Sequence, residues 1–275
     1  MHGSHFGEGN LARWPSTSAA IPRLSSARQR DMRIVPEECP VALVYDGTTV
    51  AVVMATPADL TDLAIGFSLT EGIIKSSDDV EHLDIVPGAD GIELRMWLAA
   101  AAGGDFRRRQ RRMVGPTGCG LCGIESLAEA TRSFGRLRRE IILRSNQIEH
   151  GMDALSRAQV LNHVTHATHA AGFYLPGGTL IAIREDVGRH NALDKLVGAL
   201  AAQRIPGQSG AALMTSRISI ELVQKTAAIG CPILVAISAP TALAVRAAEE
   251  YGITLVAVAR GSSFEIFTHP DGIGD

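Results

Sequence analysis

The pattern of apolar and polar positions changes along the chain. Between residues 33 and 100, short apolar-polar alternations suit strands that bury one face, and Asp46-Gly47 is a strong signal for a two-residue hairpin turn. Between the two predicted hairpins, Thr56 and Pro57 open a helical repeat as its N-cap and first residue. The strands predicted in this part are residues 41–45, 48–55, 82–86 and 92–98. Residues 33–100 therefore predict a small α+β unit.

From residue 152 onward, helical repeats alternate with short apolar runs. The predicted helices are residues 154–166, 191–203, 218–229 and 241–251, and the predicted strands are residues 179–184, 211–215, 233–238, 254–259 and, at an edge, 264–268. This alternation predicts an α/β unit with a mainly parallel sheet covered on both faces. In such sheets ligands bind outside the carboxyl ends of the strands. Residues 215–217, 238–241 and 260–263 follow strands there, and their hydroxyls, Arg260 and two adjoining helix starts suit a phosphate.

Composition limits the class of protein. The 275 residues are 46% hydrophobic, enough for a core, and hold no apolar run as long as a membrane span. Aromatic residues make up only 4%, which argues against a stacking platform for single-stranded nucleic acid. Four cysteines and no signal-peptide pattern make a reducing cytoplasm the default. We expect a disordered leader over residues 1–32, a unit over 33–150 and a second unit over 151–275.

The chemistry most visible in the sequence is a C-x-x-C pair, Cys119 and Cys122, in a turn with four glycines. A helical repeat begins directly after it, so the positive end of a helix is expected near both thiols. Residues 107–144 hold ten Arg and three Glu, a local charge of +7 in a chain of net charge −3. Both features lower a thiol pKa and favour the thiolate. The five arginines within residues 107–112 are either a solvated loop or an attractor for an anionic partner.

Several uses of the thiol pair conflict with the pattern. A structural zinc site lacks a second cluster, because Cys39 and Cys231 stand alone. A zinc deaminase lacks its His-x-Glu, which occurs nowhere in the chain. The histidines at 163, 166 and 169 would fan around a helix instead of converging on one ion. A dithiol redox motif stays an alternative, although a thioredoxin-type pair would follow the first strand of a βαβ unit and this pair follows a long basic loop. No metal site is expected, and sulfur transfer through a persulfide is the chemistry that remains.

The chain resembles the FdhD family of formate dehydrogenase accessory proteins over about residues 35–270. The resemblance rests on the T-G-C-G-L-C-G turn, the run E-D-V-G-R-H-N-A-L-D-K from Glu185 to Lys195, and residues 238–241. Further matches are Thr56-Pro57, residues 64–67, 70–72, 221–225 and 252–255. Two departures concern the pocket. Residues 165–170 read T-H-A-T-H-A where the family has T-G-G-x-H-A, and residues 215–217 read T-S-R in place of S-G-R.

The resemblance implies a cytoplasmic sulfur carrier, a sulfurtransferase. It would accept sulfur from a cysteine desulfurase as a persulfide and pass it to the molybdenum bis(guanine dinucleotide) cofactor of formate dehydrogenase. It further implies a cytidine-deaminase-like second domain without zinc and a homodimer. The persulfide residue matches Cys119, with Cys122 as an auxiliary. The segment that contacts the cofactor matches Val258, Ala259, Arg260, Gly261, Ser262 and Ser263.

Three questions stay open on the sequence. Arg189, His190, Asp194 and Lys195 form a helix start with satisfied charges, or else Arg189 or His190 points at the transferred sulfur or at a phosphate. A cofactor-binding chaperone without sulfur chemistry is a second hypothesis for the whole chain. A zinc-stabilised interaction module is a third.

Overall fold

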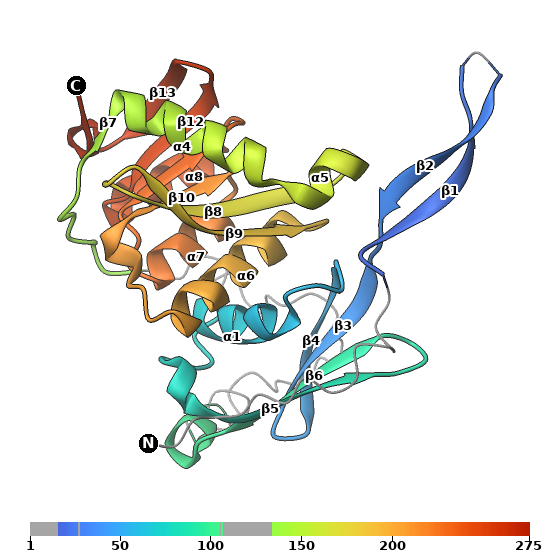
Figure 1. The fold of residues 1–275 in the computed structure, drawn as a ribbon. Helices are drawn as coiled ribbons and strands as arrows, with labels where there is room; N and C mark the ends of the chain where they lie inside the picture. Colours follow the sequence, from blue (N-terminus) through green and yellow to red (C-terminus); the bar gives the residue numbers. More distant parts are fainter. Residues whose placement is uncertain (1–15, 27, 105, 107–133) are drawn as a thin grey trace.

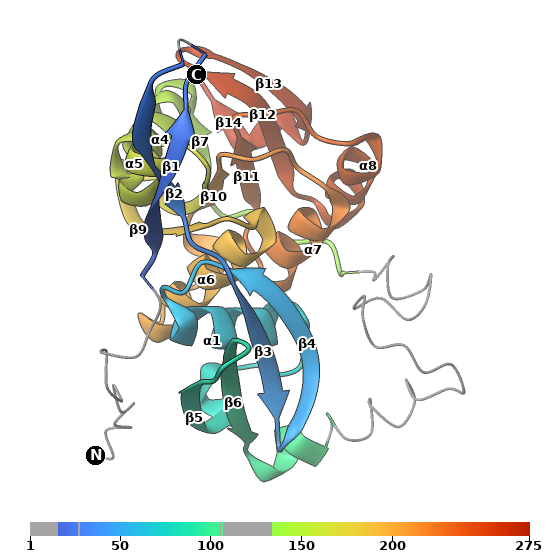
Figure 2. The same ribbon diagram turned by 90° about the vertical axis from the view of Figure 1, so that its right-hand side faces the viewer.

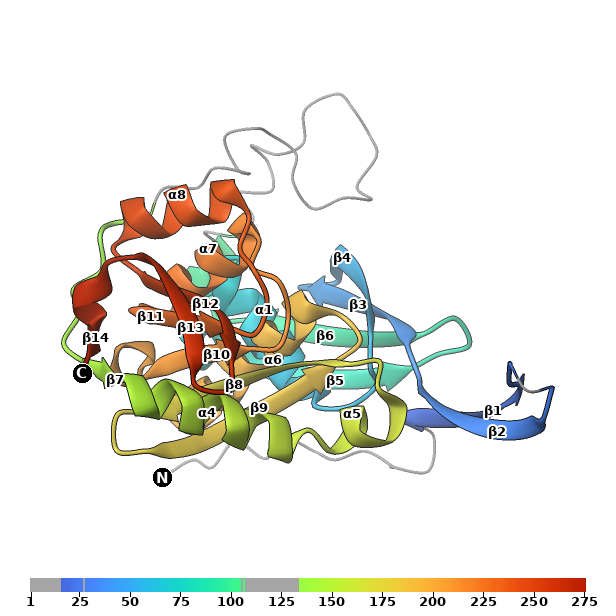
Figure 3. The same ribbon diagram turned by 90° about the horizontal axis from the view of Figure 1, so that it is seen from above.

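The computed structural model describes residues 16–26, 28–104, 106 and 134–275. Two sheets, each with helices packed on it, make up the body, and a two-stranded ribbon projects from it (Figure 1). The smaller sheet and the ribbon come from the N-terminal part of the chain, and the larger sheet comes from the C-terminal part. Figures 2 and 3 show the same parts from the side and from above.

The N-terminal sheet has the order β4-β3-β6-β5. Its strands are β3 (Cys39–Tyr45), β4 (Thr48–Ala55), β5 (Val80–Pro87) and β6 (Ile92–Leu98), with the short helix η2 (Ser77–Asp79) before β5. Both predicted hairpins are confirmed. Asp46 and Gly47 take φ of 46° and 81°, the left-handed values that a tight hairpin turn requires. Residues on β6 alternate between buried and more exposed, so one face packs against α1 (Leu60–Thr70), as predicted.

The predicted start of α1 is wrong. The helix begins at Leu60 with Asp59 as N-cap, and Thr56 lies outside it. Thr56 is fully buried because its backbone and hydroxyl bind the C-terminal unit instead: its N–H donates to Asp186 Oδ2 (3.0 Å), and its hydroxyl accepts from the Val187 N–H (3.1 Å). A residue that looked like a helix cap therefore joins the two units.

The C-terminal sheet has six strands in the order β13-β12-β11-β10-β8-β9. They are β8 (His169–Leu175), β9 (Thr179–Asp186), β10 (Ala211–Met214), β11 (Ile233–Ala236), β12 (Thr254–Arg260) and β13 (Ser263–Thr268). Only the pairs β10–β11 and β11–β12 are parallel. The prediction of a mainly parallel sheet is therefore wrong, and the fold is a mixed α/β one. Strand β8 was not among the predicted strands. Short hairpins join β8 to β9 and β12 to β13, and a short hairpin forces antiparallel pairing.

Helices cover both faces of this sheet, as predicted. The helices α6 (Arg189–Ala202), α7 (Ile220–Ala228) and α8 (Ala242–Tyr251) enclose one core with it, and α4 (Ser145–Ala158) encloses another. The predicted helix over residues 154–166 is two helices, α4 and α5 (Val160–Thr165). The remaining elements are η3 (Gly207–Ser209), η4 (Pro270–Gly272), and the parallel pair β7 (Leu143–Arg144) and β14 (Ile273–Gly274). Because α4 begins at Ser145, the C-terminal unit starts before residue 151.

The two units meet where α1 crosses α6 (Figure 1). Gly66 and Gly198 lie at this crossing. A Cβ on Gly66 would stand 1.7 Å from the backbone O of Asp194, and a Cβ on Gly198 would stand 2.0 Å from the backbone O of Asp62. The backbones touch without an intervening side chain, so the units form one packed body.

Residues 18–36 form the projecting ribbon, which we call the arm. It consists of β1 (Ser18–Leu24) and β2 (Arg30–Pro36), paired antiparallel over their full length (Figure 3). The sequence predicted a disordered leader up to residue 32, and the structure differs from residue 18 onward. Backbone hydrogen bonds and an ion pair between Arg23 and Asp31 (2.6 Å) hold the arm together with few buried side chains, which left little apolar pattern to recognise.

Candidate functional site

The loops predicted to bind a ligand do lie together at one edge of the C-terminal sheet. The Ile218 N–H donates to the Ala239 carbonyl (3.4 Å), and the Thr241 N–H donates to the Ile218 carbonyl (2.9 Å). The Val258 N–H donates to the Ser238 carbonyl (3.5 Å). These bonds place residues 215–219 and 238–241 and the bend at Val258 side by side. We call this edge, residues 186–190, 215–219, 238–241 and 258–263, the strand-end rim.

Three hydroxyls of the rim are used within the protein. Thr241 caps α8 by accepting from the Ala244 N–H (3.2 Å), and Thr215 Oγ1 accepts from the Ala170 N–H (2.8 Å). Ser216 is buried and donates to the Arg217 carbonyl (3.0 Å). The hydroxyls therefore shape the loops, while Arg217 stays exposed beside them.

The predicted cofactor segment is a bent hairpin. Arg260 ends β12, Gly261 takes φ of 56°, and Ser263 begins β13, so residues 260–263 form an exposed turn. Val258 has φ of 54° at a break in the strand register. A β-branched residue in the left-handed region is strained, and such strain gathers at ligand-binding sites. The segment thus sits on the rim, and its contact with a cofactor stays a prediction.

The run from Glu185 to Lys195 contains a buried ion pair between its second and last residues. Lys195 Nζ lies 2.6 Å from Asp186 Oδ2, and both side chains are fully buried. Asp186 also accepts from the N–H groups of Gly188 (2.7 Å) and Thr56 (3.0 Å) and from Asn191 Nδ2 (3.0 Å). Lys195 donates its other bond to the Thr56 carbonyl (2.9 Å). These residues join β9, α6 and the N-terminal unit, so their charges serve the structure.

A second buried group involves Asp194, the residue directly before Lys195 on α6. Lys225 Nζ, from α7, donates to Asp194 (2.9 and 3.0 Å), Glu71 Oε1 (2.9 Å) and Thr70 Oγ1 (3.0 Å). Burial lowers the pKa of Lys225, but the carboxylates of Asp194 and Glu71 outweigh it, so the pKa is raised overall. For Asp194 and Lys195, satisfied charges are the correct interpretation.

Two more charges of this region are also structural. Glu185 accepts from the N–H groups of Leu161 and Asn162 (both 2.8 Å) and so caps the start of α5. Arg184 binds Asp62 of α1 at 2.6 Å. Two side chains of the run remain for chemistry, Arg189 and His190.

His190 lies at the first turn of α6 and faces the start of α7. Its Nε2 is 3.4 Å from Ser219 Oγ and 3.8 Å from Glu221 Oε2. Burial, together with the positive charges of Arg189 and Lys225, lowers the pKa of His190 to about 4. The imidazole is therefore neutral at physiological pH and can donate from one nitrogen while it accepts at the other.

Arg189 is the rim's partly buried positive charge. Its Nε is buried and has no hydrogen-bond partner among the residues that the structure describes. The pKa of His169, at the start of β8, is lowered mainly by the burial of that imidazole and secondly by the positive charge of Arg189. A guanidinium with an unused donor beside two helix starts is suited to an anion.

One departure from the family pattern has a visible structural effect. His166 takes φ of 55° at the end of α5, where its N–H donates to the Asn162 carbonyl (2.8 Å). Glycine adopts this conformation without strain. The backbone therefore keeps the shape that a glycine would give it. His163 and His166 are exposed, and His169 belongs to a strand, so the three histidines do not share a helix face.

The cysteines within the described residues are not reactive ones. Cys231 is fully buried, which raises the pKa of its thiol to about 11, and partial burial raises that of Cys39. Cys231 is thus a small buried side chain of the hydrophobic core. Cys119, Cys122 and the arginines of residues 107–112 lie outside the described residues, and their roles stay predictions.

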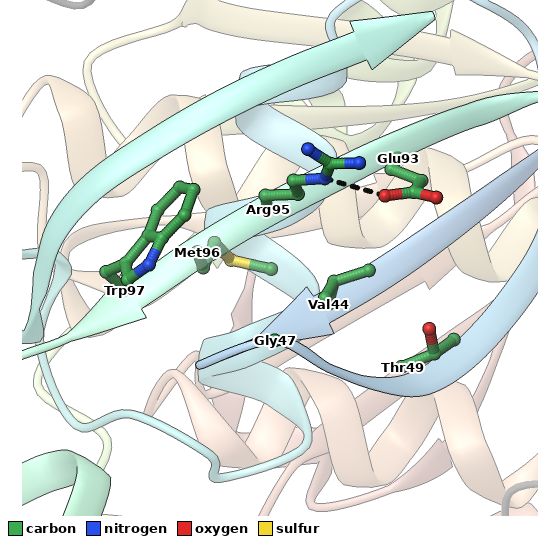
Figure 4. A pocket seen from close by; sticks show the side chains of 7 residues that line it. All are labelled: Val44, Gly47, Thr49, Glu93, Arg95, Met96 and Trp97. Carbon is green, nitrogen blue, oxygen red and sulfur yellow. Dashed lines mark hydrogen bonds and ion pairs between the residues drawn. The ribbon is translucent and has the colours of Figure 1, made fainter. Parts of the chain in front are cut away.

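Other kinds of site are not visible in residues 16–26, 28–104, 106 and 134–275. No three His, Cys, Asp or Glu residues gather there to hold a metal ion. No helix in these ranges is long and apolar enough to cross a membrane. A hollow of about 370 Å³ lies on the N-terminal sheet, between Trp97 and the Arg95–Glu93 ion pair (Figure 4). It contains no residue of the strand-end rim.

These features define a two-unit α/β protein with a cationic strand-end rim. Residues 36–274 match the FdhD/NarQ family model, and the chain belongs to this family, which confirms the resemblance. It is 52% identical over 242 residues to the sulfur carrier protein FdhD of Agrobacterium fabrum, covering 88% of this chain and 89% of the relative. The FdhD of Brucella abortus is 51% identical over 245 residues, 89% of this chain and 91% of the relative.

A solved structure shows the same fold. It is the crystal structure of a protein assigned as a formate dehydrogenase accessory protein from Desulfotalea psychrophila, with a TM-score of 0.76 and 25% identity. The match covers 94% of this chain and all of that one.

The sequence did not reveal which charged residues form buried structural ion pairs and which remain available to a ligand. It singled out the run from Glu185 to Lys195 but left open which members act on a ligand. Thr56, 130 residues away from Asp186, gave no signal of this contact because its neighbour Pro57 favoured a helix cap. For the second buried group one signal was available. Thr70 and Glu71 lie in one of the segments that resemble the family, and Lys225 lies in another.

Proposed function

We propose that this protein is a cytoplasmic sulfur carrier for the maturation of a formate dehydrogenase. It accepts sulfur from a cysteine desulfurase as a persulfide on Cys119 and passes it to the molybdenum bis(guanine dinucleotide) cofactor, which is its client. The observation that carries the proposal is identity of about half the residues to relatives named sulfur carrier protein, over nearly the full length of both chains.

The chemistry of loading is an exchange between sulfur atoms. The thiolate of Cys119 attacks the outer sulfur of the donor persulfide, a new S–S bond forms, and the donor cysteine leaves as a thiolate. No oxidant is consumed. The arginine-rich surroundings of the turn in the sequence favour the thiolate. The high pKa of the Cys231 thiol makes that residue unfit for the same role.

The strand-end rim supports the second half of the proposal, binding of the cofactor's nucleotide. Arg189 has an unused donor, and Arg260 stands exposed on a turn whose Gly261 lets a ligand approach the backbone. Neutral His190 can bind a phosphate oxygen or a base edge without adding charge. We assign the nucleotide phosphates to this rim.

Calorimetry with GDP and ADP tests the rim. We expect GDP to bind, and Arg260→Ala and Arg189→Ala to weaken it, while Arg157→Ala, an exposed arginine on α4, leaves it unchanged. If GDP does not bind at millimolar concentration, the rim is not a nucleotide site. Replacement of the five arginines in residues 107–112 by Gln tests whether that segment attracts the anionic client.

Loading with a desulfurase separates the proposal from its two alternatives. A sulfur carrier gains the mass of one sulfur atom, which mass spectrometry detects. A chaperone without sulfur chemistry would bind GDP and gain no sulfur. A zinc-stabilised module would instead carry zinc in a metal assay of the purified protein.

A further inference from the structure

A carboxylate stands beside the strand-end rim, which is otherwise cationic. Within residues 186–190, 215–221, 238–241 and 258–263, the arginines are Arg189, Arg217 and Arg260, and the carboxylates are Asp186 and Glu221. Asp186 is fully buried in its ion pair, whereas Glu221 lies in the first turn of α7 with its side chain 42% exposed. An exposed carboxylate repels phosphates. Glu221 therefore serves either the protein itself or a part of the ligand other than its phosphates.

Hydrogen bonds that begin on α6 hold the Glu221 carboxylate in place. Ser219 Oγ donates to the carboxylate. His190 Nε2 lies 3.4 Å from Ser219 Oγ and 3.8 Å from Glu221 Oε2. Because the serine proton points to the carboxylate, the neutral imidazole carries its own proton on Nε2 and donates it to Ser219 Oγ. The carboxylate is thus fixed where the starts of α6 and α7 meet.

This carboxylate is ionised and can accept further hydrogen bonds. Burial alone would raise the pKa of Glu221, but hydrogen bonds from Ser219 and from the Glu221 N–H, with the positive charge of Arg189, lower it overall. No lysine or arginine in the described ranges pairs with it. A carboxylate offers about four lone-pair sites, and Ser219 and the backbone use only part of them. Its exposed side can therefore accept from a ligand that carries two adjacent donors.

We propose that Glu221 binds the base of the nucleotide and selects guanine. The inference rests on the nucleotide site proposed above and adds the origin of its specificity. Guanine carries two adjacent donors, N1–H and the 2-amino group, which match the two oxygens of one carboxylate. Adenine has a lone pair at N1 and no amino group at carbon 2, so a carboxylate repels it. The arginines then bind the phosphates, while Glu221 binds the base edge.

Calorimetry with three diphosphates that differ at carbon 2 of the base tests the proposal. IDP lacks the amino group of GDP, and xanthosine diphosphate (XDP) has an oxygen there. The variant Glu221→Gln keeps the shape of the side chain and replaces one acceptor oxygen by an NH₂ donor. Glu249→Gln, whose carboxylate is 62% exposed near the far end of α8, is the matched control. Circular dichroism checks that both variants fold.

We expect the wild type and the control to bind GDP about ten- to a hundredfold more tightly than IDP, because the 2-amino group donates to a charged acceptor. In Glu221→Gln this preference should disappear. XDP should bind Glu221→Gln at least about tenfold more tightly than it binds the wild type, since the amide donates to the oxygen that the carboxylate repels. A damaged helix start would weaken all three nucleotides alike, so a gain for XDP identifies contact with the base.

The possible failures are distinguishable. If the wild type binds GDP without preference over IDP, or if Glu221→Gln keeps the preference, the guanine assignment is wrong while the phosphate site stands. Equal weakening of the three nucleotides in Glu221→Gln would show that Glu221 only supports the start of α7, which also overturns the assignment. If no nucleotide binds the wild type, the nucleotide site of the proposed function fails, and the base assignment fails with it.

Discussion

Replacement of Lys195 by methionine tests the buried junction of the two units. Lys195 Nζ is 2.6 Å from Asp186 Oδ2 and 2.9 Å from the Thr56 carbonyl, with no solvent exposure. Methionine fills a similar volume but leaves the Asp186 carboxylate buried without a counter-charge. Removing one partner of a buried pair costs about 3–5 kcal/mol, a large share of the ~5–15 kcal/mol that stabilises a typical domain. We therefore expect Lys195→Met to be close to the limit of folding.

Urea denaturation, followed by far-UV circular dichroism, measures this loss as a lower midpoint. Arg95→Met is the matched control, since its pair with Glu93 is equally short (2.7 Å) but nearly half exposed, and we expect it to cost below about 1 kcal/mol. The double variant Asp186→Asn/Lys195→Met should be more stable than Lys195→Met alone, because no charge is then left buried. Equal, small losses for Lys195→Met and Arg95→Met would refute the reasoning.

Two further predictions concern the helix crossing and pH. Gly66→Ala places a methyl group 1.7 Å from the Asp194 carbonyl O, and we expect it to lower the free energy of unfolding, measured with urea, by about 3 kcal/mol. Gly135→Ala, where no atom lies within 4 Å of the added methyl group, should change that free energy little. Equal effects of the two substitutions would contradict the close packing at the helix crossing. The lowered pKa of His190 (about 4, against 6.5) means that the unfolded chain binds this proton first, so its share of stability is complete above pH 6.5 and is lost as the pH falls toward 4. Because the His190 side chain is 36% exposed, solvent screening reduces this contribution to about 1–2 kcal/mol. His190→Gln should therefore flatten the dependence of stability on pH between 4 and 6.5. An unchanged dependence would contradict the lowered pKa.

Local signals in the sequence predicted local structure well. The Asp46-Gly47 turn and the alternation on β6 were sufficient for the two hairpins of the N-terminal sheet, and the apolar runs located five of the six strands of the C-terminal sheet, β9 to β13. Strand β8 was missed because its first four residues, His169 to Gly172, include two alanines and a glycine, which are depleted in strands. With β8 missing, the antiparallel half of the sheet could not be predicted.

The site was predictable where topology alone decides it. Loops after neighbouring strands must share an edge, and residues 215–219 and 238–241 do so. The division of charges was not predictable, because it depends on contacts between residues far apart, such as Thr56 with Asp186 and Asp194 with Lys225. The bend at Val258 likewise arises from a register break between β12 and β13, which no local pattern announces.

The most direct test of the sulfur-carrier function is residue-resolved loading of the full chain. The protein is incubated with a cysteine desulfurase and cysteine, and the added sulfur is located by mass spectrometry of peptides. We predict one added sulfur on Cys119, lost in Cys119→Ala and kept in Cys39→Ala and Cys231→Ala, whose thiols have raised pKa values. Label retained in Cys119→Ala but lost in Cys122→Ala would reverse the roles of the pair. Absence of added sulfur on either cysteine, with an active desulfurase, would contradict the function itself.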